Sequence, residues 1–163
     1  MNDGFAVRPA KAGEEAAIGA LINTIQRREF GIPITLEDQP DLADIDGFYR
    51  QGAGDFWVAT HGECIVGTIA LIDIGDGMGA LRKMFVHEDY RGRKKGVAGD
   101  LLDVLLGHAK VRGFSEIFLG TTAAFGAAHR FYEKNGFSLI AAEDLPKGFP
   151  RMDVDTRFYR FDI

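Results

Sequence analysis

Residues 91–99 read Arg91-Gly92-Arg93-Lys94-Lys95-Gly96-Val97-Ala98-Gly99, a basic and glycine-rich stretch. It follows an apolar run, residues 81–86, that predicts a β-strand, and it opens a segment, residues 97–110, whose apolar side chains recur at helical spacing. A turn between a strand and a helix directs backbone N–H groups and the positive end of the helix dipole toward one place. Anions are favoured there. We therefore predict that this turn binds a phosphate or a pyrophosphate.

The composition is that of an ordinary soluble protein. Of the 163 residues, 46% are hydrophobic and 26% are charged, which predicts a single domain over residues 1–163. The net charge of −5 argues against a nucleic-acid partner, because such proteins spread basic charge along a face. Cys64 is the only cysteine, and the four histidines lack metal-ligand spacing, so we expect no disulfide and no metal. No apolar run approaches membrane-span length. We expect a cytoplasmic protein that does not bind membranes.

The order of expected elements predicts a mixed sheet. We expect strands at residues 5–8, 56–60, 64–72, 81–86, 116–120, 137–141 and 157–161, and helices at 12–28, 42–51, 97–110 and 123–134. Tight turns at residues 61–63 and 75–77 make the second, third and fourth strands antiparallel neighbours. The helix after the glycine-rich stretch makes the fourth and fifth strands parallel through a right-handed crossover. The predicted fold class is α/β (α+β), a mostly antiparallel seven-stranded sheet flanked by about four helices.

This order, with the glycine turn in that place, resembles the GNAT superfamily of acetyl-CoA-dependent N-acetyltransferases over nearly the whole chain. Residues 93–98 fit that family's Arg/Gln-x-x-Gly-x-Gly/Ala turn. Residues 128–137 resemble its A-x-x-[LF]-Y-E-K-x-G-F segment, and residues 84–86 resemble the strand end that holds the pantetheine arm. The resemblance implies an acyl-CoA N-acyltransferase fold in which the parallel fourth and fifth strands splay apart.

The resemblance also implies the cofactor, acetyl-CoA (coenzyme A). Its phosphates suit stacked N–H donors and long cations, and glycine or alanine lets the backbone approach them closely. The cofactor-binding residues implied are Met84, Phe85, Val86, Arg91, Arg93, Lys94, Lys95, Gly96, Val97, Ala98, Gly99, Thr121, Phe125, Ala128, Phe131 and Lys134.

Catalytic roles follow from the same resemblance. Tyr132 matches the family tyrosine near the thioester sulfur and is the expected general acid, since a phenol stays protonated at neutral pH. A main-chain N–H in the region of Phe85 and Val86 is expected to polarise the thioester carbonyl. Many relatives carry a glutamate base where this chain has Ala80, so the base is unassigned. Phe125 replaces a family asparagine and is expected to pack on the pantetheine or to line the acceptor pocket.

The acceptor is expected to be the primary amine of a small molecule, an amino acid or a peptide. Arg28, Glu29 and Phe30 are candidate substrate-binding residues, because Arg28 and Glu29 continue the inward stripe of the helix at 12–28, beside an irregular loop. A helix-end ion pair is the alternative for Arg28 and Glu29. Arg28 and Arg151 together raise the hypothesis of a carboxylate on the acceptor.

Two broader alternatives remain open at the level of sequence. A non-catalytic coenzyme A sensor or interaction domain would use the same fold, and the missing strand glutamate is consistent with it. A nucleoside-triphosphate enzyme is excluded, because Gly96 is followed by Val97 and Ala98 where such a loop needs lysine and serine or threonine. The sequence is compatible with a monomer or a homodimer.

Overall fold

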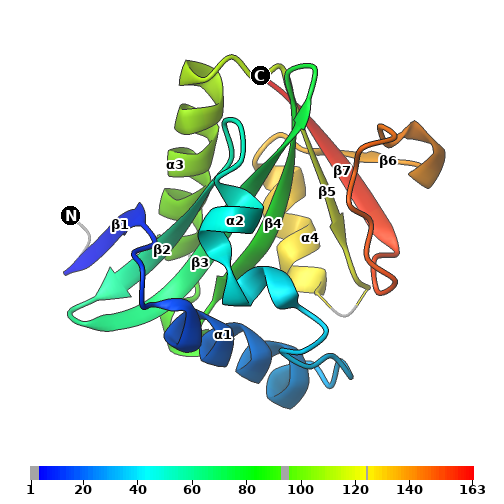
Figure 1. Cartoon of the computed structure of the whole chain (residues 1–163). Coiled ribbons are helices and arrows are strands. Elements are labelled where there is room, and N and C mark those ends of the chain that lie inside the picture. Colours follow the sequence, from blue (N-terminus) through cyan, green and yellow to red (C-terminus); the bar gives the residue numbers. More distant parts are fainter. Residues whose placement is uncertain (1–3, 93–95, 124) are drawn as a thin grey trace.

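The computed structural model describes residues 4–92, 96–123 and 125–163 (Figure 1). Its centre is a seven-stranded sheet in the order β1-β2-β3-β4-β5-β7-β6, in which only β4 and β5 are parallel. The strands are β1 Phe5–Pro9, β2 Asp55–His61, β3 Cys64–Gly75, β4 Met78–Val86, β5 Glu116–Thr121, β6 Ser138–Ile140 and β7 Arg157–Asp162. The α-helices are α1 Glu15–Thr24, α2 Ile45–Tyr49, α3 Val97–Val111 and α4 Gly126–Lys134. The predicted fold class is confirmed.

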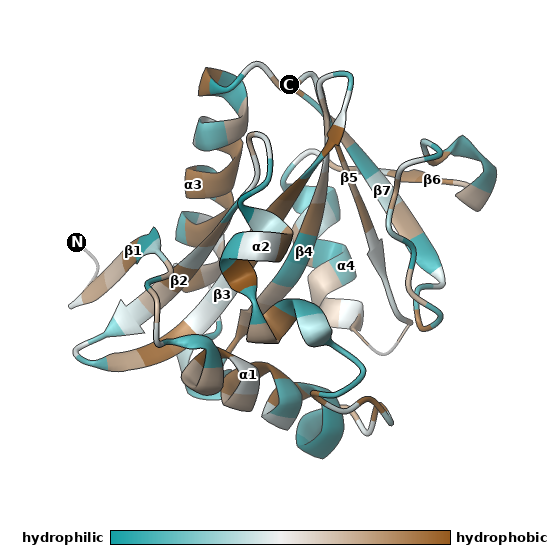
Figure 2. Ribbon diagram, viewed as in Figure 1, coloured by the Kyte–Doolittle hydropathy of each residue, from teal (hydrophilic) through white to brown (hydrophobic). Residues whose placement is uncertain are grey.

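Side chains that alternate along the strands are buried in two apolar core layers, one on each face of the sheet. Phe56 and Val58 of β2 pack with residues of α1 and α2, whereas Trp57 and Ala59 pack with residues of α3. This alternation is the period of a strand that is buried on both faces. Figure 2 shows apolar and polar residues mixed along the strands and around α3. The sheet therefore lies between one layer of α1 and α2 and another of α3 and α4.

The turn between β3 and β4 has the geometry that its sequence predicts. Gly75 pairs with Met78, so the loop consists of Asp76 and Gly77 alone. Their φ angles are 56° and 75°, as a type I′ hairpin turn requires. This turn fixes the register of β4, the strand that forms one wall of the site described below.

The parallel strands β4 and β5 separate soon after they meet. They pair only from Met78↔Glu116 to Ala80↔Phe118, at the start of both strands. Beyond Ala80, the described residues of β4 have no partner on the β5 side, and Figure 1 shows the two strands diverging. The splay predicted for these strands is thereby confirmed, and it opens the sheet at its centre.

A β-bulge bends β4 next to this opening. Ala70 pairs with Arg82 and Thr68 with Phe85, so two residues of β4, Lys83 and Met84, oppose one of β3. Lys83 has a φ of 55°, which is uncommon for a residue other than glycine. The Thr68 hydroxyl donates a hydrogen bond of 2.6 Å to the Lys83 carbonyl and supports this conformation.

The first two helices differ from their predicted bounds. The helix expected at residues 12–28 ends as α1 at Thr24 and continues as one π-helical turn, η1 Ile25–Glu29, in which the Phe30 N–H donates to the Ile25 carbonyl at 3.2 Å. The helix expected at 42–51 is divided into a 3₁₀ turn, η2 Pro40–Ala43, and α2. The Asp44 side chain separates them, because it accepts a hydrogen bond from the Gly47 N–H and caps α2.

Candidate active site

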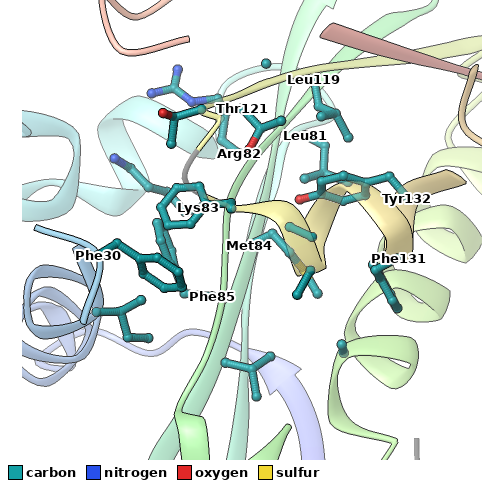
Figure 3. Close-up of a pocket in the computed structure, with 18 of the residues that line it drawn as sticks. Phe30, Leu81, Arg82, Lys83, Met84, Phe85, Leu119, Thr121, Phe131 and Tyr132 are labelled. Carbon is teal, nitrogen blue, oxygen red and sulfur yellow. The ribbon is translucent and has the colours of Figure 1, made fainter. Parts of the chain in front are cut away.

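A cavity of about 750 Å³ occupies the opening between β4 and β5 (Figure 3). Residues from η1, β4, the glycine turn, β5, α4 and the loop before β7 line it. The predicted cofactor residues found in its wall are Met84, Phe85, Val86, Arg91, Gly96, Ala98, Gly99, Thr121, Phe125, Ala128, Phe131 and Lys134. Residues far apart in the sequence thus meet at the place where the sheet opens. Their binding roles stay predictions.

The described part of the glycine turn is shaped for close approach by a ligand. Gly96 is the N-cap of α3 with a φ of 69°, a left-handed conformation that favours glycine. A Cβ built on Gly96 or Gly99 would meet no described atom within 4 Å, so both glycines border open space. Val97 points the other way and is buried in the core with Leu101, which anchors the turn. The predicted contacts of Arg93, Lys94 and Lys95 lie outside the described residues.

Arg91 ties the glycine turn to the end of η1. Its guanidinium forms a bidentate ion pair with Glu29, whose second hydrogen bond measures 2.8 Å, and its Nε donates to the Val86 carbonyl at 2.7 Å. The guanidinium carbon also lies 5.9 Å from the centre of the Phe30 ring. Phe30 lines the cavity, whereas Glu29 does not. The structure therefore pairs Glu29 with Arg91 of the glycine turn.

The expected inward stripe is wrong for Arg28 and Glu29. Arg28 is exposed, the Glu29 side chain pairs with Arg91, and neither residue lines the cavity. The cause is the π-helical turn, whose wider spacing of residues rotates these two side chains outward. It buries Gln26, which lines the cavity and exchanges two hydrogen bonds with the buried Gln39 at 2.9 and 3.1 Å.

Tyr132 lies on α4 at the side of the cavity opposite Arg82 and Lys83. Its ring packs against Phe137 and Tyr159, with centroids 5.5 and 5.9 Å away. Figure 3 shows the hydroxyl directed toward β4. Among the residues that the structure describes, none hydrogen bonds to this hydroxyl. Burial, with a smaller contribution from Tyr159, raises the pKa of Tyr132, so the phenol keeps its proton at neutral pH.

The two departures from the family pattern have different surroundings. Ala80 is fully buried in an apolar cluster with Phe118, Phe149 and Phe158 and is absent from the cavity wall. Phe125 lines the cavity at the start of α4, where its ring lies 4.7 Å from that of Phe30 and 6.0 Å from that of Phe85. The three phenylalanines form an apolar part of the cavity wall, and the role of Phe125 toward the pantetheine or the acceptor stays a prediction.

Sequence reasoning missed two cations on β4. Arg82 and Lys83 both line the cavity (Figure 3), although consecutive side chains of a regular strand point to opposite faces. The bulge at Lys83 is the reason. Two adjacent cations within an otherwise apolar strand were a signal that something polar meets this strand. The left-handed lysine, however, has no local signature in the sequence.

Lys83 is held in a buried polar network. Its Nζ donates to the Gln39 Oε1 at 2.5 Å and lies 3.7 Å from Asp41 Oδ2, and Asp41 in turn accepts a short hydrogen bond from the Tyr49 hydroxyl. Burial lowers the pKa of Lys83 to about 8, and the nearby Asp41 carboxylate opposes that shift. Lys83 is thus a partnered cation.

Asp155 is the third cavity group that sequence reasoning missed. It lies in the loop before β7, lines the cavity, and accepts a hydrogen bond of 2.9 Å from the Met152 N–H. Burial raises the pKa of this carboxyl, whereas the Met152 hydrogen bond and the nearby cations oppose the shift. A Cβ on Gly120 of β5 would lie 2.7 Å from Asp155 Oδ2, so the absence of a side chain at Gly120 makes room for the carboxylate.

The described ranges contain neither a membrane-spanning helix nor a metal-binding cluster. In residues 4–92, 96–123 and 125–163, no helix combines the length and the apolar character needed to cross a membrane. Within the same ranges, no group of three or more His, Cys, Asp or Glu side chains could hold a metal ion.

Comparison with known proteins identifies the family. The model of the Acetyltransferase (GNAT) family matches residues 20–137. A crystal structure of an acetyltransferase of the GNAT family from Staphylococcus aureus Mu50 superposes with a TM-score of 0.93 at 38% identity, covering 97% of this chain and 98% of that one. PaiA N-acetyltransferase from Thermoplasma acidophilum, in complex with coenzyme A, superposes with a TM-score of 0.73, covering 98% and 99% of the two chains, and at 15% identity it shows the fold alone.

Curated relatives match over a shorter region. N-acetylaspartate synthetase of Danio rerio is 36% identical over 125 residues, which are 74% of this chain and 43% of that protein. The chain therefore spans less than half the length of that relative. The family match over most of the chain, the likeness to the staphylococcal structure over nearly all of it, and the cavity at the splayed strands agree. The chain belongs to the acetyltransferase (GNAT) family.

Proposed function

We propose that this chain transfers the acetyl group of acetyl-CoA to a primary amine. The observation that carries the proposal is the cavity at the splay of β4 and β5, which joins the Gly96 turn at one end to the Tyr132 hydroxyl and the β4 bulge in its interior. Family membership supports the reaction class, and the coenzyme A in the PaiA complex supports the cofactor.

The residues present fit acetyl-CoA. The unpaired edge of β4 beyond Ala80 offers backbone donors and acceptors to the amide groups of a pantetheine arm. The first N–H groups of α3, behind Gly96 with its open space, would hold the pyrophosphate. Arg91, Arg130 and Lys134 line the same cavity and add positive charge. The cofactor, when bound, supplies an activated acetyl group as a thioester.

The chain's own groups suit direct transfer. Tyr132 carries a hydroxyl proton in the cavity, where it can be given to a thiolate leaving group. Main-chain N–H groups near Phe85 and Val86 are the proposed donors to the developing oxyanion. Phe30, Phe85 and Phe125 give this part of the cavity an apolar wall, a surface that disfavours water. No side chain has to form a covalent intermediate.

A free-thiol release assay with acetyl-CoA and a panel of primary amines tests the proposal. The panel contains amino acids, amino-acid amides, polyamines, aryl-alkylamines and peptides. We expect thiol release that requires both substrates and mass-spectrometric detection of an N-acetylated product. The alternative is a non-catalytic coenzyme A sensor, which the missing strand glutamate leaves open. Saturable acetyl-CoA binding with no turnover of any amine would favour that alternative.

Three wider expectations stay predictions. We propose that residues 1–163 fold as one domain, because one sheet joins all three apolar clusters. We propose a reducing, cytoplasmic setting from the single Cys64. Monomer and homodimer are both compatible with the fold, and light scattering distinguishes them.

A further inference from the structure

The wall of the cavity formed by β4 and the loop before β7 carries two opposite charges, Arg82 and Asp155, which lie near each other but form no direct ion pair. Arg82 is half-buried, and no described carboxylate lies within ion-pair distance of its guanidinium. Asp155 is buried, and no described cation lies within ion-pair distance of its carboxylate. Charged groups in such surroundings are normally paired, because desolvation without a partner is costly.

Arg82 and Asp155 both contact Met152. Arg82 Nη2 lies 3.0 Å from Met152 Sδ, and Arg82 Nη1 donates a long hydrogen bond of 3.4 Å to the Pro150 carbonyl. Asp155 accepts from the Met152 N–H at 2.9 Å, and its own N–H donates to the Met152 carbonyl at 3.0 Å. The Arg82 guanidinium and the Asp155 carboxylate therefore lie in one small region of the cavity wall, on either side of Met152, and the described structure shows no direct ion pair between them.

The other described cations of the cavity wall have their own hydrogen-bond and ion-pair partners or lie on α4. Lys83 is bound to Gln39 and faces Asp41. Arg91 forms its bidentate pair with Glu29. Arg130 and Lys134 are exposed on α4. Arg82 is the cavity cation that the described structure leaves available beside the loop before β7.

Arg82 and Tyr132 lie on opposite sides of β4. Leu81 and Met84 pack in the core cluster that contains Tyr132, whereas Arg82 contacts the loop before β7. Figure 3 shows Arg82 and Lys83 on one side of the strand and Tyr132 and Phe131 on the other. If the cofactor lies along α3 and α4, then Arg82 and Asp155 are on the side from which the acceptor enters.

We propose that Arg82 and Asp155 form the acceptor subsite and that it takes a free α-amino acid, with Arg82 holding the carboxylate and Asp155 facing the α-amino group, which binds as ammonium and gives up one proton to solvent before it attacks the thioester. An α-amino acid carries its two opposite charges a few ångströms apart, which matches a cation and an anion on either side of Met152. A planar guanidinium suits a carboxylate because it can donate two hydrogen bonds. This inference rests on the proposed function, and it replaces Arg28 and Arg151, neither of which lines the cavity.

Matched acceptor pairs test the subsite. Each L-amino acid is compared with its α-carboxamide, which keeps the amine and removes the negative charge. The wild-type protein should acetylate at least one amino acid with a kcat/KM about 100-fold above that of its carboxamide, because a site built to bind a polar group discriminates strongly against its loss. Arg82→Gln should remove most of that preference by lowering kcat/KM for the acid while changing that for the carboxamide less than about threefold.

Controls separate the subsite from the cofactor site and from folding. Arg112→Gln makes the same substitution at an exposed residue after α3 and should leave the preference intact. Acetyl-CoA affinity, measured by calorimetry, should be unchanged in Arg82→Gln. Asp155→Asn keeps the shape of the side chain and should raise KM for amino acids. Circular dichroism confirms that each variant is folded.

Three outcomes would overturn parts of this picture separately. Equal activity of the wild type on acid and carboxamide, or an unchanged preference in Arg82→Gln, contradicts the subsite and leaves acetyl transfer standing. Acetyl-CoA binding with no turnover of any amine contradicts the proposed function. In that case, calorimetric titration of amino acids into the coenzyme A complex still tests the subsite. Binding to the wild type that is lost in Arg82→Gln supports the subsite. The absence of binding to the wild type rejects it.

Discussion

At the scale of single residues, Tyr132 combines burial with an unused hydroxyl. Its ring is held by Phe137 and Tyr159, so removing the oxygen leaves the packing in place. We predict that Tyr132→Phe lowers kcat about 100-fold, the lower end of what a positioned acid contributes. The melting temperature and the acetyl-CoA dissociation constant should barely change. Steady-state kinetics and calorimetry measure both quantities, and a kcat within threefold of wild type would reduce Tyr132 to a core aromatic.

The lowered pKa of the buried Lys83 predicts how the free energy of unfolding depends on pH. Its folded-state pKa is lowered to about 8, below the value of about 10.4 that a lysine has in an unfolded chain. Between these two values the unfolded state binds more protons than the folded state, so the free energy of unfolding rises with pH, by up to about 1.4 kcal/mol per pH unit. Below pH 8 both states are charged and this contribution is flat.

Substitution of Lys83 isolates that contribution. We expect the wild type to gain stability relative to Lys83→Met as the pH rises from 8 to 10, and the difference between the two to be constant from pH 6 to 7.5. Urea denaturation at each pH measures it. Lys110→Met, at an exposed position of α3, is the matched control and should run parallel to the wild type. Parallel curves for Lys83→Met and the wild type would contradict a lowered pKa of the buried Lys83.

At the scale of elements, sequence patterns within single segments predicted the features that depend on nearby residues alone. The seven strands, the two-residue turn of Asp76 and Gly77, and the start of α3 at Val97 follow from alternation, turn chemistry and a glycine N-cap. The cavity wall that holds the proposed cofactor residues was predictable because these residues belong to contiguous motifs. Arg82 and Asp155 were not, since a bulge in β4 and a loop about 70 residues later bring them together. Such long-range contacts leave no periodic trace.

The π-helical turn is the clearest difference between pattern and structure. The apolar spacing of α1 predicts a regular helix through Arg28, but η1 holds one more residue per turn than an α-helix would. That extra residue directs Gln26 and Phe30 toward the cavity and leaves Arg28 outside. The turn therefore positions Gln26 and Phe30 in the cavity wall, and we predict that this wall contacts the acceptor.

Deletion of Arg28 tests that role. Removing one residue should convert the π-helical turn into regular helix and rotate Phe30 away from Phe125. We predict that the variant folds with a somewhat lower melting temperature, binds acetyl-CoA within about threefold of wild type, and has an acceptor KM raised at least tenfold. Arg28→Ala, which keeps the chain length and changes only an exposed side chain, is the control. If deletion and substitution behave alike, the turn does not position the acceptor wall.

At the scale of the whole molecule, the splay divides the sheet. Strands β1 to β4 pair extensively on one side, and β5, β7 and β6 pair on the other, whereas β4 and β5 share three residue pairs. The cluster around Trp57 crosses this seam, since it contains Leu71 and Leu81 from one side and Ile117 and Tyr159 from the other. The apolar core, rather than strand pairing, joins the two halves.

This continuity predicts one cooperative unfolding transition for the described fold. Trp57, the only tryptophan, reports on the first half of the sheet, and a Trp57→Phe, Phe161→Trp double variant moves the reporter to β7 in the second. In each protein we expect the fluorescence transition in urea to coincide with that of far-UV circular dichroism, as two-state unfolding requires. Comparing two probes within one protein removes any effect of the substitution on stability itself. Separated midpoints would instead show that the seam is the boundary between two cooperative units, with the cavity lying between them.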